Sequence, residues 1–155
     1  MKRVLVLGVF VVDGTVEIAA PADVVWGVIT GFERYGEWNP FVSECRSTLE
    51  VGAPIDMVVH LTGSKPRRQR EFITSHTPGE EFSYSMKPVP FGALHSRRTH
   101  TVTALGPDRT RYESHFELGG WLKPVVELAL GKALRRGFTG MTEGVARQAE
   151  SLHAA

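Results

Sequence analysis

The 155-residue sequence has almost no cysteine, no excess of charge of either sign, and no hydrophobic run long enough to cross a membrane. The single cysteine, Cys45, excludes an intrachain disulfide and a multi-cysteine zinc site. Eighteen Lys and Arg against 17 Asp and Glu leave a net charge of +1, so no overall positive field is present to hold a nucleic acid. A lone thiol suits a reducing compartment, and we expect a cytoplasmic protein.

Motifs for metals and cofactors are missing as well. The six histidines form no His-x-His or HExxH pair, and metal binding needs several ligands at such spacing. The glycine-rich phosphate motifs GxGxxG and GxxxxGK[ST] are also absent. We therefore expect no metal, no cofactor and no nucleic-acid partner.

The chain opens with MKRVLVLGVFVV, in which two basic residues precede a short apolar run. This is the pattern of a signal peptide, but a small-residue cleavage site occurs only weakly, at Ile18-Ala19-Ala20, and cutting there would remove the strand before Pro21. We interpret the segment as a strand or an N-terminal extension.

A short helix and a tryptophan turn follow the first strand. Pro21 to Thr30 predicts a helix, with a proline at its start, Asp23 in its first turn and Gly31 at its end. After the turn Trp38-Asn39-Pro40, beta-type segments alternate with Gly, Pro and Asp clusters. The candidate strands are 41–49, 55–61, 69–76, 82–86, 94–105 and 110–118. Such close spacing favours antiparallel neighbours.

From Pro124 onward the period becomes helical. One stripe is apolar and consists of Leu130, Leu134, Phe138, Met141, Val145 and Leu152. Four glycines interrupt this helix, each costing about 1 kcal/mol relative to alanine: Gly131, Gly137, Gly140 and Gly144. Close packing on a sheet is one explanation, and a soft helix that bends to admit a ligand is the other.

These elements predict a single α+β domain over residues 1–155, in which a curved antiparallel sheet of about seven strands grips a long C-terminal helix, with two short helices after the first strand. Three stretches carry a family resemblance: AAPADVVWGVITGFERYGEWNPF, HTVTALGPDRTRYESHFELGGWLKPVV and GFTGMTEGVARQAE. With them the chain resembles the START-like (SRPBCC) superfamily, and within it the polyketide cyclase/dehydrase and lipid-transport family.

The resemblance implies a helix-grip fold that encloses an elongated, mostly apolar cavity. Members of the superfamily bind lipids, sterols, hormones or polyketides, and a minority catalyse cyclisation, aromatisation or dehydration. Fold alone does not decide among these functions. Our leading hypothesis is a carrier or sensor of a hydrophobic small molecule. A polyketide cyclase or dehydratase and an interaction domain with a vestigial cavity are the alternatives, and a homodimer is left open.

The hairpin from Arg97 to Glu117 predicts part of the cavity wall, because alternating residues face opposite sides of a sheet. A register that pairs Arg97 with Glu117 puts charged residues on the wet face. The inner face then carries the polar residues Arg98, His100, Tyr112 and Ser114, with Phe116 beside them. Phe138 and Met141, on the stripe of the terminal helix, complete the predicted ligand-binding set.

Polar groups that converge in an apolar pocket are typical of a small-molecule site. Arg98 and Tyr112 are candidates to anchor or polarise a ligand carbonyl, phenol or carboxylate, and His100 is the candidate proton carrier. The alternative is structural: Arg98 lies at the rim or pairs with a carboxylate, His100 bonds the backbone, and Tyr112 is a core residue with its hydroxyl satisfied. The basic hairpin tip, Lys65 to Arg70, is either a solvated loop or a contact for anionic lipid headgroups.

Overall fold

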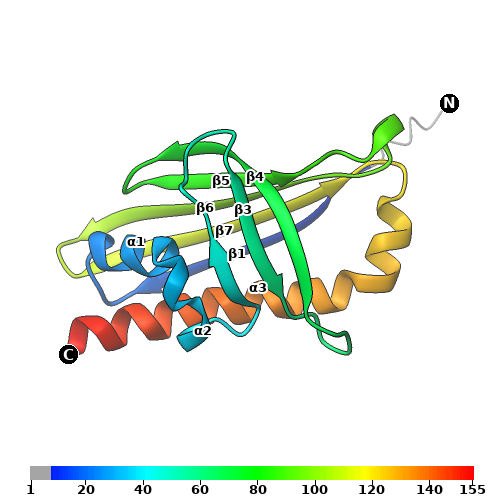
Figure 1. Cartoon of the computed structure of the whole chain (residues 1–155). Helices are drawn as coiled ribbons and strands as arrows, with labels where there is room; N and C mark the ends of the chain where they lie inside the picture. The colour runs from blue at the N-terminus through cyan, green and yellow to red at the C-terminus, as the bar shows by residue number, and fades with distance from the viewer. Residues whose placement is uncertain (1–7) are drawn as a thin grey trace, which may run out of the picture.

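A curved seven-stranded antiparallel sheet wraps around one long helix in the computed structural model, which describes residues 8–155 (Figure 1). The sheet order is β1-β7-β6-β5-β4-β3-β2. Its strands are β1 (Phe10–Ile18), β2 (Val42–Arg46), β3 (Pro54–Val59), β4 (Arg67–Thr77), β5 (Glu81–Met86), β6 (His95–Gly106) and β7 (Arg109–Gly119). The helix-grip prediction is confirmed. The start of the apolar N-terminal run, residues 1–7, lies outside the described residues.

The register predicted for the last hairpin is also confirmed. Arg97 pairs with Glu117, and Arg98 pairs with Phe116. His100 stands opposite Ser114. The tight turn between β6 and β7 leaves little freedom in the pairing, and a shift of one residue would carry the apolar side chains to solvent.

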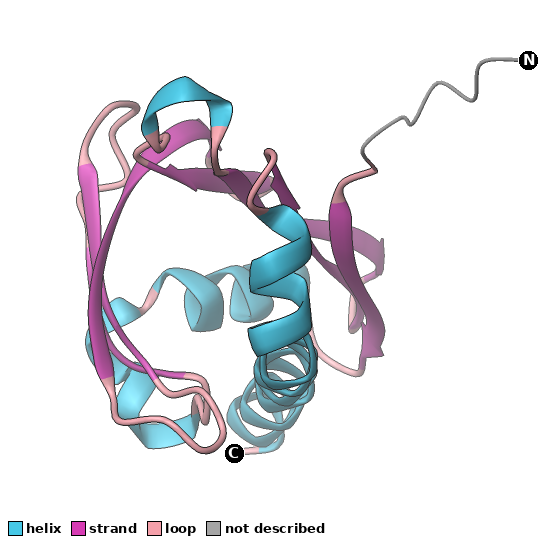
Figure 2. Ribbon diagram, turned by 90° about the vertical axis from the view of Figure 1, so that its right-hand side faces the viewer, coloured by secondary structure: helices cyan, strands magenta, loops and turns pink. Residues whose placement is uncertain are grey.

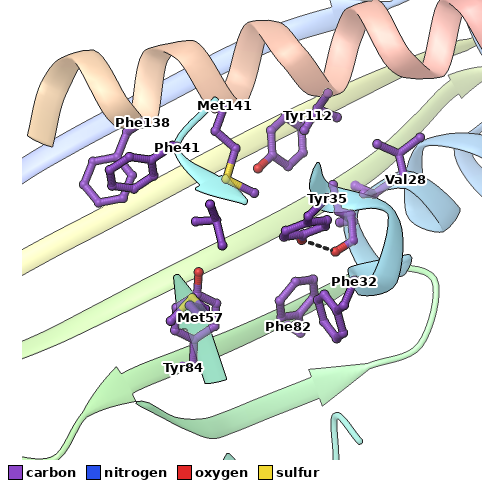
Figure 3. Packing of buried hydrophobic residues seen from close by; sticks show 14 of the residues in the cluster. Val28, Phe32, Tyr35, Phe41, Met57, Phe82, Tyr84, Tyr112, Phe138 and Met141 are labelled. Atoms are coloured by element: carbon purple, nitrogen blue, oxygen red, sulfur yellow. Dashed lines mark hydrogen bonds between the residues drawn. The ribbon is translucent and has the colours of Figure 1, made fainter. Parts of the chain in front are cut away.

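Short helices close one end of the sheet. They are α1 (Ala22–Thr30), the 3-10 turn η1 (Phe32–Arg34) and α2 (Tyr35–Trp38). Pro21 precedes α1 with extended dihedrals, rather than beginning the helix as predicted. The rings of Trp26 and Phe32 both meet Phe82 of β5 edge-on, with 6.0 Å between ring centroids. Figure 3 shows Val28, Phe32 and Tyr35 gathered on the same side of the core as Phe82.

The long helix α3 (Lys123–Ala154) crosses the open side of the sheet, and it bends near its start (Figures 1 and 2). Most of its predicted apolar stripe packs inward, but Leu152 is 43% exposed, because the helix runs past the edge of the core there. Within residues 8–155, no helix combines the length and hydrophobicity needed to span a bilayer.

Three of the four helix glycines are explained by close packing. A Cβ added at Gly137 would lie 2.2 Å from the Phe41 ring, and one at Gly144 would lie 3.1 Å from Trp38. At Gly140 the nearest neighbour is Pro40, at 3.3 Å. The turn that follows α2 therefore rests directly on the helix. Gly131 has only ordinary contacts, at 3.6 Å or more.

This contrast gives a stability prediction. Gly131→Ala should raise the free energy of unfolding by up to about 1 kcal/mol, because alanine favours the helix. Gly137→Ala gains the same propensity but must displace the buried Phe41 ring, and overpacking of this kind costs about 1–3 kcal/mol. Urea unfolding should thus rank Gly137→Ala below Gly131→Ala. The reverse order would mean that α3 is not held against the turn.

Candidate functional site

A cavity of about 270 Å³ lies between the sheet and α3. Its wall is mostly apolar, with a few polar groups among aliphatic and aromatic side chains. The polar members are Arg67, Gln69, Glu71, Tyr84, Ser96 and Arg98. Figure 2 views the molecule from the end at which α3 begins, where the curved sheet and the helix face each other. The volume falls just below the roughly 300–1,000 Å³ of ordinary ligand pockets, which favours a small ligand over a phospholipid.

Arg98 of β6 is a buried cation in the wall of this cavity, and only 3% of it is exposed. Its guanidinium lies over the ring of Phe138, 4.2 Å from the centroid. Nη2 points to the sulfur of Met141 at 3.4 Å. Among residues 8–155, Nη1 finds no hydrogen-bond partner and no carboxylate forms an ion pair with Arg98. A buried donor without a partner is costly, so Arg98 is ready to bind an acceptor.

His100 supports the arginine from behind. Arg98 Nε donates to His100 Nε2 at 3.4 Å, and His100 Nδ1 lies 2.6 Å from the hydroxyl of Tyr112. A guanidinium can only donate, so Nε2 accepts, and Nδ1 carries the proton and donates to Tyr112. Burial lowers the pKa of His100 well below its usual range, and the charge of Arg98 adds to the shift. The imidazole is therefore neutral and positions Arg98.

The structure separates the seven predicted ligand-binding residues into two groups. Arg98, Phe116, Phe138 and Met141 line the cavity. His100, Tyr112 and Ser114 face inward as predicted, but they are at most 2% exposed and stand behind the wall. The reason is α1, whose buried face of Val25, Val28 and Ile29 covers that half of the sheet (Figure 3).

Glu71 is a cavity residue that sequence reasoning missed. It is 6% exposed, and one of its carboxylate oxygens accepts a hydrogen bond from Gln69. Alternation along β4 places Glu71 on the same side as Ile73. Phe72, on the opposite face, is also apolar, so the sequence does not indicate which face of β4 points inward. A bulge between Ile73 and Ser75 then shifts the register, and sequence gave no signal for it. Tyr84 of β5, also in the wall, was missed too.

Burial raises the pKa of Glu71, although Gln69 and the charge of Arg98 pull it down. A raised folded-state pKa means that the native state binds the proton more readily than the unfolded chain. The contribution of Glu71 to the free energy of unfolding is fully present below the pKa of the unfolded chain, about 4.3. It is lost as the pH rises through the pKa of Glu71 in the folded protein.

Glu71→Gln should therefore unfold at a higher temperature than the native chain at pH 7, with the gap closing at pH 4. Glutamine keeps the shape and an oxygen that accepts from Gln69, but it cannot ionise. Thermal unfolding at both pH values measures this. If the two proteins differ by the same unfolding temperature at pH 7 and at pH 4, Glu71 ionises in the fold as easily as in water.

A second depression, of about 740 Å³, lies over β2, β3 and β4 next to η1. Its wall is largely charged and includes Glu44, Arg46 and Arg68. Across it Arg70 forms a bidentate pair with Asp56, and both side chains are exposed. Such a surface suits water more than an apolar molecule, so the apolar cavity between the sheet and α3 is the better candidate site.

A sequence model of the family described as polyketide cyclase/dehydrase and lipid transport matches residues 9–150. The match spans the whole grip, from the first strand through almost all of α3. A search among curated proteins finds no significant match.

Solved structures share the fold at low sequence identity. An aromatase/cyclase, Zhui from Streptomyces sp. R1128, superposes with a TM-score of 0.75 at 18% identity, covering 92% of this chain and 94% of that one. A START superfamily protein from Mycobacterium smegmatis gives 0.65 at 19%, covering 95% and 98%. Norcoclaurine synthase from Thalictrum flavum, in complex with dopamine and hydroxybenzaldehyde, gives 0.66 at 16%, covering 95% and 92%.

Proposed function

The chain belongs to the polyketide cyclase/dehydrase and lipid-transport family, and we propose that its cavity binds one small, largely apolar molecule that carries a carbonyl, carboxylate or phenolate oxygen. The observation that carries this proposal is Arg98, a buried cation that lines the cavity and whose Nη1 has no hydrogen-bond partner among residues 8–155. The ligand's oxygen would accept from Arg98, while its apolar body would contact Phe116, Phe138 and Met141.

The surroundings of Arg98 support an oxygen acceptor over a purely hydrocarbon ligand. Hydrogen bonds to a charged donor are stronger than neutral ones, and more so in a site shielded from water. The ring of Phe138 and the imidazole of His100 hold the guanidinium in one orientation. Pre-organisation of this kind lowers the entropy cost of binding.

Titration with 2-naphthoate, followed by calorimetry, tests the proposal. It presents a carboxylate on a rigid apolar body, and we expect one molecule to bind per chain. Leu134→Trp fills the cavity from the half-buried edge of α3 and should weaken binding at least about tenfold, because the naphthalene rings lose their space. No detectable binding of 2-naphthoate to the native chain, or equal binding to Leu134→Trp, would contradict the proposal.

A second candidate function is enzymatic, and one observation favours it: Glu71 and Arg98 line the same cavity. For a bound ketone, Arg98 would stabilise the enolate oxygen while the Glu71 carboxylate takes a proton from the adjacent carbon. A carboxylate of raised pKa is a better base near neutral pH than an ordinary one. Proton removal next to a carbonyl is the first step of an aldol-type ring closure.

Deuterium exchange at the methyl group of 2-acetylnaphthalene, read by NMR, tests this candidate. The native chain should exchange these hydrogens faster than buffer. Glu71→Gln should lose about 100-fold or more of that acceleration, a typical contribution of a positioned base, while still binding the ketone. Exchange no faster than in buffer leaves binding as the function.

A further inference from the structure

The end of the molecule at which α3 begins carries an unusual set of exposed apolar side chains. Phe91 is 96% exposed, Leu128 91%, Val125 63% and Trp121 57%. We call these four residues the open-end patch. Two segments supply them: the 3-10 turn η2 (Pro90–Gly92) and the start of α3. Single exposed apolar residues are ordinary, but a group of this kind marks an interaction site.

The two segments are joined by hydrogen bonds, so the patch is one surface. Trp121 Nε1 donates to the carbonyl oxygen of Phe91 at 3.0 Å, and the Leu122 amide donates to Ala93 at 3.0 Å. Phe91 also has a φ of 63°, a left-handed conformation that non-glycine residues rarely adopt. Packing of the Phe91 ring does not offset this backbone strain, because the side chain is almost fully exposed to solvent.

The first turns of α3 are apolar on both sides. Val126, Leu130 and Leu134 line the cavity. Val125 and Leu128, three residues apart, share the opposite face. Lys123 and Glu127 of this stretch form an ion pair, but apolar side chains on both sides of a helix are ordinarily covered by protein or lipid, and the described chain leaves Val125 and Leu128 exposed.

Basic residues predominate in the segments that form the patch and in a nearby hairpin. Residues 121–137 hold four basic side chains, Lys123, Lys132, Arg135 and Arg136, against the single acidic Glu127. Lys87 is exposed just before η2. The hairpin tip between β3 and β4 adds Lys65, Arg67 and Arg68, and Arg67 also lines the cavity. In Figure 1 η2 and the start of α3 lie at the upper right, and the hairpin tip lies on the same half of the molecule but at its lower edge.

We infer that the open-end patch docks on an anionic phospholipid bilayer, with Phe91, Trp121, Val125 and Leu128 entering the headgroup region. Exposed Trp, Phe and Leu beside Lys and Arg are the composition of interfacial membrane contacts. A second copy of the chain fits less well, since a two-fold contact would bring the same basic residues of both copies together. Docking would place the cavity, bounded at this end by Leu61, Leu94 and Val126, next to the lipid.

Vesicle flotation tests this inference, with phosphatidylcholine alone compared with phosphatidylcholine plus phosphatidylglycerol. The native chain should float with the phosphatidylglycerol vesicles, less so at high salt, and the emission of Trp121 should shift to the blue. The double variant Phe91→Ser/Leu128→Ser should lose at least tenfold in vesicle affinity. Val51→Ser/Leu105→Ser, which alters two exposed apolar residues elsewhere, should bind as the native chain does.

Binding of 2-naphthoate in solution separates this surface from the cavity. Phe91 and Leu128 are not in the cavity wall, so their double variant should keep 2-naphthoate affinity, and a failure of the cavity proposal would leave flotation unaffected. The inference is overturned if the native chain does not float with phosphatidylglycerol vesicles, or if Phe91→Ser/Leu128→Ser floats equally. A concentration-dependent dimer that this variant abolishes, without vesicle binding, would assign the patch to a second copy instead.

Discussion

Arg98→Met should abolish the preference of this protein for an oxygen-bearing ligand without weakening the fold. Arg98 is 3% exposed, and its Nη1 has no hydrogen-bond partner among residues 8–155, so this donor is available to a ligand. A hydrogen bond to a charged group contributes about 1.5–3 kcal/mol, which corresponds to roughly 10- to 150-fold in Kd. Calorimetry should show this loss for 2-naphthoate and almost none for 2-methylnaphthalene.

The free energy of unfolding of Arg98→Met should not fall with its ligand affinity. Methionine fills a space similar to that of the arginine stem, and it removes a buried charge that forms no ion pair with a carboxylate within residues 8–155, although Glu71 then loses the attraction that lowers its pKa. Apolar replacements of buried charged groups are often neutral or stabilising. We therefore expect the free energy of unfolding of Arg98→Met, measured in urea, to equal or exceed the native value.

Arg135→Met is the matched control for this experiment. Arg135 also lies over a phenyl ring, that of Phe10, at 4.9 Å from the centroid, but it is exposed and lies outside the cavity wall. Its removal should leave 2-naphthoate affinity unchanged. Equal losses in Arg98→Met and Arg135→Met would mean that the ligand responds to overall charge, and a native affinity in Arg98→Met would refute the assignment of Arg98.

Gly120→Ala should be the most damaging single substitution to stability. Gly120 joins β7 to α3 with a φ of 110°, which is strained for any side chain. An added Cβ would lie 2.3 Å from the carbonyl oxygen of Ala93, and that oxygen also accepts from the Leu122 amide. Backbone strain and overpacking each cost about 1–3 kcal/mol, so urea unfolding should show a loss of about 3 kcal/mol or more.

Gly79→Ala separates the two costs. Gly79 also has a positive φ, 79°, but nothing lies within 4 Å of its added Cβ, so its loss should be only about 1–2 kcal/mol. Gly120→Ala should also weaken 2-naphthoate binding, since Val126 and Leu130 enter the cavity wall from the helix that Gly120 positions. Similar free energies of unfolding for the two variants would show that the β7–α3 connection can shift to accommodate the added Cβ at little cost.

The polar groups of the site show how far sequence reasoning reaches. Alternation in β6 and β7 predicted that Arg98, His100, Tyr112 and Ser114 face inward, because the short turn between these strands leaves one register that buries the apolar side chains. It did not predict which of them would meet the cavity. That depends on distant segments: α1 packs against β6 and β7, and the cavity that remains beside α3 is lined by Arg98 but not by His100.

Glu71 is a cavity residue whose direction the sequence could not predict. Its strand is apolar on both faces at Phe72 and Ile73, and the bulge that follows breaks the alternation, so local pattern could not assign its direction. Only the pairing of β4 with β3 and β5 turns Glu71 into the cavity that Arg98 also lines. Similarly, the sequence marks Phe91 and Leu128 as ordinary apolar residues, and only the meeting of η2 with α3 makes them one exposed surface.

By itself, then, the sequence determined the helix-grip fold: the register of the last hairpin, the short helices at one end, and a terminal helix whose glycines permit close contact. These are consequences of local periodicity, turn chemistry and side-chain size, which act over a few residues. The tertiary structure decided what lies in the grip and at its open end. Burial of His100, the unpaired state of Arg98 and the inward turn of Glu71 depend on segments far apart in the chain, and no local pattern encodes such contacts.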